Sequence, residues 1–111
     1  MIRIDIRRVK AEEEGTLRAW MAELNRRGAE VSETLAREGT RHEQAYLLKT
    51  SDGPILIYAM EAGDQDRAAE AFRDSHSAID LEHKRIMKQV LAGTAHAELV
   101  YECVIGDAVS V

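Results

Sequence analysis

The chain has 111 residues, of which 45% are apolar and 32% are charged, as in one globular domain with one core. Its net charge of −5 repels phosphate backbones and anionic lipids, so nucleic acids and membrane surfaces are not expected partners. No apolar run reaches the roughly 20 residues of a membrane span, and the N-terminus does not resemble a signal peptide. We expect a single domain over residues 1–111.

The single cysteine, Cys103, excludes a disulfide within the chain and is compatible with a reducing cytoplasm, where we expect the protein to be located. A thiolate zinc site would need further cysteines. The sequence also has no glycine-rich phosphate loop, no G-x-S-x-G and no H-E-x-x-H. We therefore expect no bound cofactor and no metal.

The N-terminal segment from Ile2 to Val9 alternates isoleucine with charged residues, which indicates a strand with one apolar and one charged face. Apolar residues then recur at the spacing of one helical face, which predicts a long helix over residues 12–38. Gly39 follows as an expected left-handed helix stop.

The stretch 41–62, RHEQAYLLKTSDGPILIYAMEA, predicts two strands joined by a turn at residues 50–53. Pro54 opens the second of these strands, a position where a missing backbone donor is tolerated. Residues 55–60 are apolar on both faces, which favours a central strand covered on both sides.

Two shorter helices are expected after this hairpin. Asp64 is the expected cap of the first helix, and Asp80 is the expected cap of the second. The second helix is expected to run to about Leu91 and to stop at Gly93. Residues 96–105 then predict a last strand.

The resulting order, βαββαβ, indicates a ferredoxin-like α+β fold with a four-stranded antiparallel sheet in the order 4-1-3-2 and both helices on one face. The charged face of the first strand would then point away from the helices. Glu98 and Glu102 of the last strand could pair with its charges. A polar, ion-paired second face is what we expect of a homodimer that packs sheet against sheet.

The segments LRAWMAELNRRG, RHEQAYLL, ILIYAMEA and IDLEHKRIM resemble a small uncharacterised bacterial family of the dimeric α/β-barrel group. The resemblance implies a dimeric barrel with a site between the sheet and the helices. The wider group includes L-rhamnose mutarotase, antibiotic-biosynthesis monooxygenases and haem-degrading monooxygenases, and the likeness to these enzymes is one of architecture.

The haem-degrading members use a histidine on the second helical segment, an asparagine on the first strand and a tryptophan. His83 lies on a comparable segment of this chain. The first strand has no asparagine, however, and the only tryptophan, Trp20, lies on the first helix. The resemblance therefore does not extend to haem binding.

His42 and Glu43 open the second predicted strand, and neighbours in a strand point to opposite faces. His42 is a candidate proton-transfer residue, and Glu43 is a candidate for orienting a substrate. The alternative is that both are polar residues at a strand end in solvent.

His83 lies on the apolar stripe of the last helix, near the positive end of the helix dipole, which favours a neutral imidazole as a proton acceptor. The alternative is a packed histidine with a satisfied ring. Asp80, three residues earlier, could orient this imidazole or bind a metal, although capping explains Asp80 without either role.

Tyr46, Tyr58 and Tyr101 lie on three predicted strands, and any of them that faces the helices could bind a substrate oxygen. Trp20 is a further candidate substrate contact, although a tryptophan on a helix stripe is most simply a core residue.

These residues favour a small-molecule-binding protein or a cofactor-independent enzyme, isomerase-like or mutarotase-like, with acid–base chemistry on a small polar organic substrate. His83 and His42 would transfer protons, while Glu43 and the tyrosines would orient the substrate. A non-catalytic dimerisation or ligand-sensing module is the alternative, and a cofactor-independent monooxygenase is a weaker one. A cavity lined by His83 and a tyrosine hydroxyl would favour the first reading.

Overall fold

The structure is a computed structural model that describes residues 1–106 of the 111, so the last five residues of the expected domain lie outside the described residues. The elements are β1 (Ile2–Val9), η1 (Ala11–Glu13), α1 (Glu14–Arg26), α2 (Gly28–Glu38), β2 (Thr40–Thr50), β3 (Gly53–Ala62), α3 (Gln65–Asp74), α4 (Ala78–Val90) and β4 (Leu91–Ala95). The strands form an antiparallel sheet in the order β2-β3-β1-β4. The predicted ferredoxin-like α+β fold and its strand order are confirmed.

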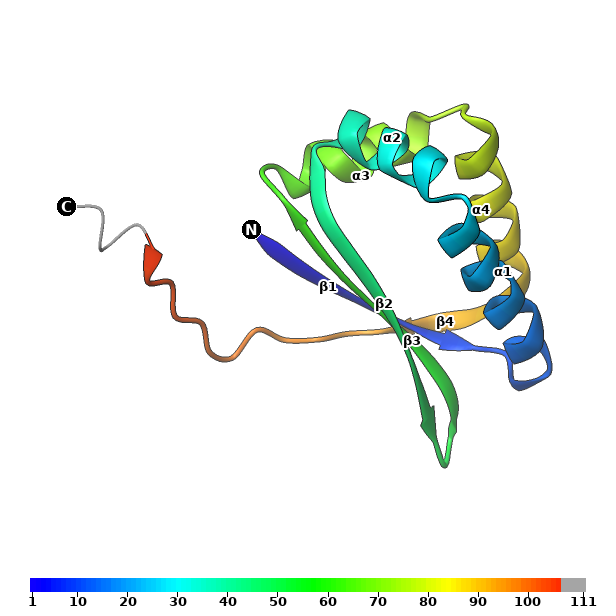
Figure 1. The fold of residues 1–111 in the computed structure, drawn as a ribbon. Coiled ribbons are helices and arrows are strands. Elements are labelled where there is room, and N and C mark those ends of the chain that lie inside the picture. Colours follow the sequence, from blue (N-terminus) through cyan, green and yellow to red (C-terminus); the bar gives the residue numbers. More distant parts are fainter. Residues whose placement is uncertain (107–111) are drawn as a thin grey trace.

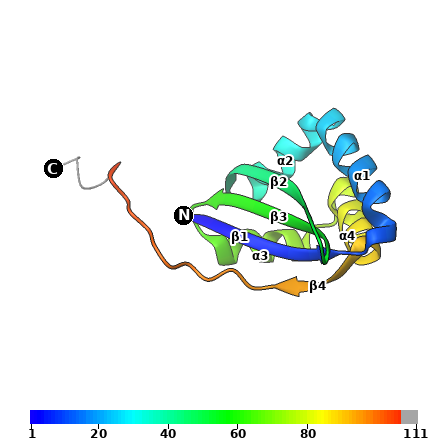
Figure 2. The same ribbon diagram turned by 90° about the horizontal axis from the view of Figure 1, so that it is seen from below.

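The helices arch over one face of the sheet, and the opposite face carries no helix of residues 1–106 (Figures 1 and 2). The buried core lies where α1 and α4 meet the sheet, and its members are Val9, Leu17, Trp20, Leu56, Ile79, Ile86 and Val90. None of the helices in the described part of the chain is long and apolar enough to cross a membrane.

Local sequence signals explain the hairpin and two helix ends. β3 pairs with β2 on one side and with β1 on the other, so the prediction of a central strand is confirmed. The Asp64 carboxylate accepts a hydrogen bond from the backbone N–H of Arg67 at 3.0 Å and caps α3, as predicted. Gly39 ends α2 with a φ of 76°, the left-handed conformation that glycine adopts without strain.

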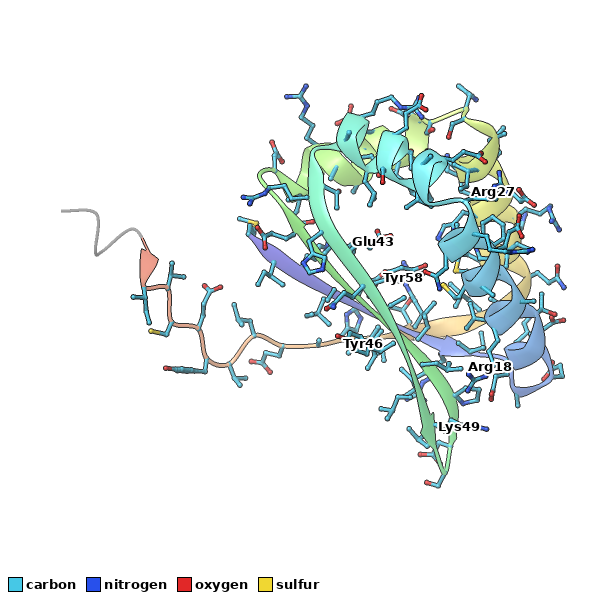
Figure 3. The ribbon with its side chains drawn as sticks, viewed as in Figure 1. Arg18, Arg27, Glu43, Tyr46, Lys49 and Tyr58 are labelled. Atoms are coloured by element: carbon cyan, nitrogen blue, oxygen red, sulfur yellow. The ribbon has the colours of Figure 1, made fainter. Side chains whose placement is uncertain are left out.

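The long helix predicted over residues 12–38 is wrong in one respect, because it is broken into α1 and α2 at Arg27, whose φ and ψ are −102° and 40°. The next residue is Gly28, a poor helix former. The Arg27 side chain reaches across the break and forms ion pairs with Glu30 at 2.9 Å and with Glu82 of α4 at 2.8 Å. The break lets α1 and α2 lie at an angle to each other, so that both helices follow the sheet (Figures 1 and 3).

Two predictions for the C-terminal part are also wrong. Ser77, not Asp80, caps α4, because the Ser77 hydroxyl accepts the Asp80 N–H at 3.3 Å. The last strand is residues 91–95, where Leu91 is already extended and Gly93 belongs to β4 instead of ending the helix. Residues 96–105 leave the sheet and run away from the body (Figure 1).

The two faces of β1 are reversed relative to the prediction. Arg3, Asp5 and Arg7 point toward the helices and line a cavity there. Ile2 and Ile4 lie on the open face and are exposed. Asp5 and Arg7 pair with each other at 3.2 Å. These two inward charges therefore do not need Glu98 or Glu102, which lie beyond β4.

Candidate functional site

A cavity of about 330 Å³ lies between the inner face of the sheet and the arch of helices. This volume lies within the range of about 300–1,000 Å³ typical of small-molecule pockets. Its wall is formed by Arg3, Asp5, Arg7, Leu24, Val31, Thr34, Leu35, Glu38, Thr40, Glu43, Tyr58, Met60, Gln65, Ala68, Ala69, Phe72, Ile79, Asp80 and His83.

Strand register places the polar residues of the cavity floor on adjacent rungs. Tyr58 of β3 lies opposite Asp5 of β1. On the next inward-facing rung, Met60 lies between Arg3 of β1 and Glu43 of β2. Glu43 and Tyr58 are therefore diagonal neighbours on the same face, which for paired strands means a separation of about 7–8 Å. Figure 3 shows both on the helix side of the sheet.

Three aromatic side chains from different elements meet at one end of the cavity. The Trp20 indole N–H of α1 donates to His83 Nδ1 at 2.8 Å. Tyr58 Oη of β3 lies 3.3 Å from His83 Nε2. The Phe72 ring of α3 meets the imidazole edge-on, with the two ring centroids 5.7 Å apart. His83 is thereby held from three sides.

The hydrogen bond from Trp20 determines the protonation of this group. An indole N–H can only donate, so His83 Nδ1 must be the unprotonated, accepting nitrogen. The ring is then neutral, with its hydrogen on Nε2, and it donates to Tyr58 Oη. Burial lowers the pKa of His83 to about 4, against a smaller opposing effect of the Asp80 charge, which agrees with a neutral ring.

With the hydrogen of His83 placed on Nε2, it is Tyr58, not His83, that can donate a hydrogen bond to a ligand. With Nδ1 and Nε2 both engaged, His83 has no free lone pair, and its expected role as a proton acceptor has no geometric support here. Tyr58 Oη accepts from His83, and its own hydrogen is left for a ligand. Burial, with the Glu43 and Asp5 charges, raises the pKa of Tyr58, so the phenol stays protonated.

The other side of the cavity is acidic. Burial raises the pKa of Glu38, the last residue of α2, to about 7, and the charges of Asp80 and Glu43 act in the same direction. Burial and the Asp80 charge also raise the pKa of Glu43. Since its pKa is about 7, Glu38 retains a proton in a substantial share of the molecules near neutral pH.

Asp80 supplies the fixed negative charge of this group. It is only 3% exposed, and its Oδ2 accepts hydrogen bonds from Thr34 Oγ1 of α2 and from Ser75 Oγ at 2.5 Å. Burial alone would raise the pKa of Asp80, but the hydroxyls of Ser75, Thr34 and Ser77 outweigh it and the pKa is lowered. Asp80 therefore ties α2 to the start of α4.

The alternative of a metal at Asp80 and His83 has no support in the described part of the chain. Both nitrogens of His83 are engaged, so the ring offers no ligand atom. No group of three or more histidine, cysteine, aspartate or glutamate side chains within residues 1–106 could hold a metal ion.

The structure brings some of the expected site residues together. His83, Tyr58 and Glu43 line the cavity, and Trp20 lies behind His83 through its hydrogen bond. Three further candidates, His42, Tyr46 and Tyr101, do not line the cavity. His42 and Tyr46 alternate with Glu43 along β2 and therefore lie on the outer face, as Figure 3 shows for Tyr46. Tyr101 is 70% exposed in the segment beyond β4.

Glu38, Thr34 and the inward charges of β1 were not expected at the site. The sequence could have indicated Thr34 and Glu38, because they are spaced by one helical turn and lie beside the apolar stripe of α2, which faces the sheet. The alternating pattern of β1 shows that the strand has one apolar and one charged face. It does not show which face points toward the helices.

The sequence profile of DUF6176, described as a family of unknown function, matches residues 2–107. The chain belongs to this family. No curated protein matches the DUF6176 chain. Among solved structures, it is similar to tetracenomycin F2 cyclase from Streptomyces glaucescens, described as a type-II polyketide cyclase. The TM-score is 0.60 at 16% identity, over 96% of this chain and 99% of the cyclase chain, which shows a shared fold.

Proposed function

We propose that the protein binds a small organic molecule with an enolisable carbonyl group in the cavity and moves a proton on it without a cofactor. The observation that carries this proposal is the Tyr58 hydroxyl, which His83 holds so that its hydrogen is free, beside two carboxyl groups, Glu38 and Glu43, whose pKa values are both raised by burial and nearby charge. Titratable groups with perturbed pKa values that meet in one cavity are typical of acid–base sites.

In the proposed step, the Glu43 carboxylate takes a proton from the carbon next to the substrate carbonyl. The C–H bond breaks, an O–H bond forms on Glu43, and the electron pair moves to the carbonyl oxygen as an enolate. The Tyr58 hydroxyl donates to this oxygen where the negative charge develops. Glu38, which retains a proton near pH 7, returns one to the same carbon from its opposite face, so that the O–H bond on Glu38 breaks, a C–H bond forms, and the product is the epimer of the substrate at that carbon. Solvent then takes the proton from Glu43 and restores the one on Glu38.

The shared fold supports chemistry on organic molecules in a pocket of this architecture, because the similar structure is that of a polyketide cyclase. An enolate formed in the cavity could also attack a second carbonyl of the same molecule, which would close a ring. The residues that form the enolate would be the same in both reactions.

The test is exchange of the acidic methylene protons of 2-tetralone for deuterium, followed by proton NMR in D₂O at pH 7. We expect the protein to accelerate exchange above the buffer rate, and Tyr58→Phe and Glu43→Gln each to lower this acceleration by roughly 100-fold or more. Tyr46→Phe is the matched control, because Tyr46 lies on the outer face, and it should leave the rate unchanged. Exchange at the buffer rate with the unmodified protein would overturn the proposal.

We also propose that two copies associate through the open face of the sheet. This face carries apolar side chains of β1 and β2 that are 46% to 67% exposed in the single chain, namely Ile2, Ile4, Tyr46 and Leu48. The inner strand β3 adds Ile57, which lies between Ile6 and Tyr46. An exposed apolar sheet face of this kind is typical of an interface. The proposed interface has an apolar centre, unlike the polar one expected from the sequence.

A further inference from the structure

A second cavity, of about 260 Å³, adjoins the first one. Five residues line both cavities, and they include Tyr58, His83 and Phe72. The hydrogen-bonded pair of Tyr58 and His83 therefore stands at the boundary, and a molecule that presents a carbonyl to Tyr58 can extend into either cavity.

The two cavities differ in charge. The first is lined by four carboxylic acids and two arginines, namely Asp5, Glu38, Glu43, Asp80, Arg3 and Arg7. The second is lined by one acid and two basic residues, namely Asp5, Arg7 and Lys84. An anionic group on a ligand would be repelled from the first cavity and attracted to the second.

Arg7 has the free donors that an anionic group needs. Its Nε donates to Asp5 Oδ1 at 3.2 Å and to Oδ2 at 3.3 Å. Its Nη atoms make no hydrogen bond to any of residues 1–106. Asp5 thus holds the guanidinium by one edge and leaves the other for a planar oxyanion. Lys84 Nζ is held by the carbonyl oxygens of Arg73 and Ser75 and adds a positive charge at a fixed place.

We propose that the second cavity is a carboxylate subsite in which Arg7 binds the acid group of the molecule whose carbonyl meets Tyr58. The substrate class is then a keto carboxylic acid, with its ketone at Tyr58 and its carboxylate on Arg7. This inference rests on the proposed function, because it takes Tyr58 as the group that receives the ketone.

The test compares 3-benzoylpropionate with its methyl ester, two ketones that differ in the negative charge and in one methyl group. Trp20 is the single tryptophan and is hydrogen-bonded to His83, so its fluorescence reports binding of either probe. We expect the acid to bind roughly tenfold or more tightly than the ester, as one charge-assisted contact provides. Arg7→Gln should make the two affinities equal, and Asp5→Asn, which removes a competing carboxylate, should increase the ratio.

Arg8→Gln is the matched control, because Arg8 is the next residue of β1, points to the outer face and lines neither cavity. It should keep the preference for the acid. If the ester binds to the unmodified protein as tightly as the acid, the subsite is overturned and the proposed function stands. If neither probe binds but the protein still accelerates the exchange of 2-tetralone, only the subsite is overturned, and if that acceleration is also absent, both proposals fail. Asp5→Asn takes the place of Arg7→Gln as evidence if the latter does not fold. If Asp5→Asn leaves the ratio of acid affinity to ester affinity unchanged or lowers it, the subsite is contradicted.

Discussion

Asp80 is almost fully buried and yet is expected to keep its charge, because hydroxyl groups from two other segments point at one of its oxygens. After burial, which is the largest cause, its charge is the next cause that raises the pKa of both Glu38 and Glu43. A single side chain therefore serves two purposes, since it joins α2 to α4 and contributes to the raised proton affinity of the acidic side of the cavity.

Asp80→Ala should lower the free energy of unfolding by about 2–4 kcal/mol, because the hydroxyls of Thr34 and Ser75 lose a charged acceptor. Asp74→Ala is the matched control. Asp74 is exposed at the end of α3, so its removal should change the stability by less than about 0.5 kcal/mol. Urea unfolding at pH 7 measures both. Equal losses in the two variants would show that Asp80 does not tie the helices together.

His83 and Glu38 should give opposite pH dependences of stability. The pKa of His83 is lowered from 6.5 to about 4, so the unfolded chain takes up the proton first, and stability is lost as the pH falls through this window. The pKa of Glu38 is raised from 4.5 to about 7, so its protonation favours the folded state, and stability is lost as the pH rises through that window.

Chemical unfolding at pH 8 and pH 5 separates the two effects. Protonation of His83 should lower the free energy of unfolding of the unmodified protein by about 2 kcal/mol between pH 8 and pH 5. His83→Gln should lack this decrease. Protonation of Glu38 should raise the free energy of unfolding of the unmodified protein by about 1 kcal/mol over the same interval, a value reduced for the partial exposure of this carboxyl. Glu38→Gln should lack this increase. The neighbours Glu43, Asp80, Arg37 and Lys84 are present in all three proteins. Differences of the same sign in the two variants would contradict the assignment.

At the scale of elements, the bend between α1 and α2 and the left-handed end of α2 give the arch its shape. Gly28 begins α2 in a helical conformation, whereas Gly39 ends α2 with a positive φ. A methyl group added at either glycine would meet nothing within 4 Å. Backbone conformation alone therefore decides the effect of replacing them.

The same substitution should thus have opposite signs at the two ends of α2. Gly28→Ala should raise the free energy of unfolding by about 0.5–1 kcal/mol, because alanine restricts the unfolded chain and fits the helix. Gly39→Ala should lower it by about 1 kcal/mol, because alanine is strained in the left-handed region. Thermal or urea unfolding of the two variants measures both effects. A lower free energy of unfolding for Gly28→Ala would show that the backbone at Gly28 is not helical.

At the scale of the whole molecule, the open face of the sheet should join two copies. We expect the unmodified protein to sediment as a dimer at micromolar concentration. Ile4→Asp, which places a charge in the middle of the apolar face, should shift it to the monomer with unchanged helical content. Ala19→Asp, on the exposed side of α1, is the control and should stay dimeric. A monomeric unmodified protein would overturn the proposed interface.

Periodicity along the sequence was sufficient to predict the element order, the central place of β3 and the local ends at Asp64 and Gly39. Each of these depends on residues that are neighbours in the chain. The direction of the β1 charges was not predictable, because it depends on which face the helices cover. The contact of Trp20 with His83 spans 63 positions and has no local signal, so the role of Tyr58 could be derived only from the structure.

Trp20 fixes the protonation of His83, so that Tyr58 directs its hydrogen into the cavity. Proton–nitrogen correlation NMR of the protein labelled with ¹⁵N-histidine at pH 7 tests it directly. We predict a neutral ring with the hydrogen on Nε2 and no titration above pH 5, since the pKa of His83 is about 4. A hydrogen on Nδ1, or a titration near the ordinary value of 6.5, would show that Trp20 does not fix the protonation of His83.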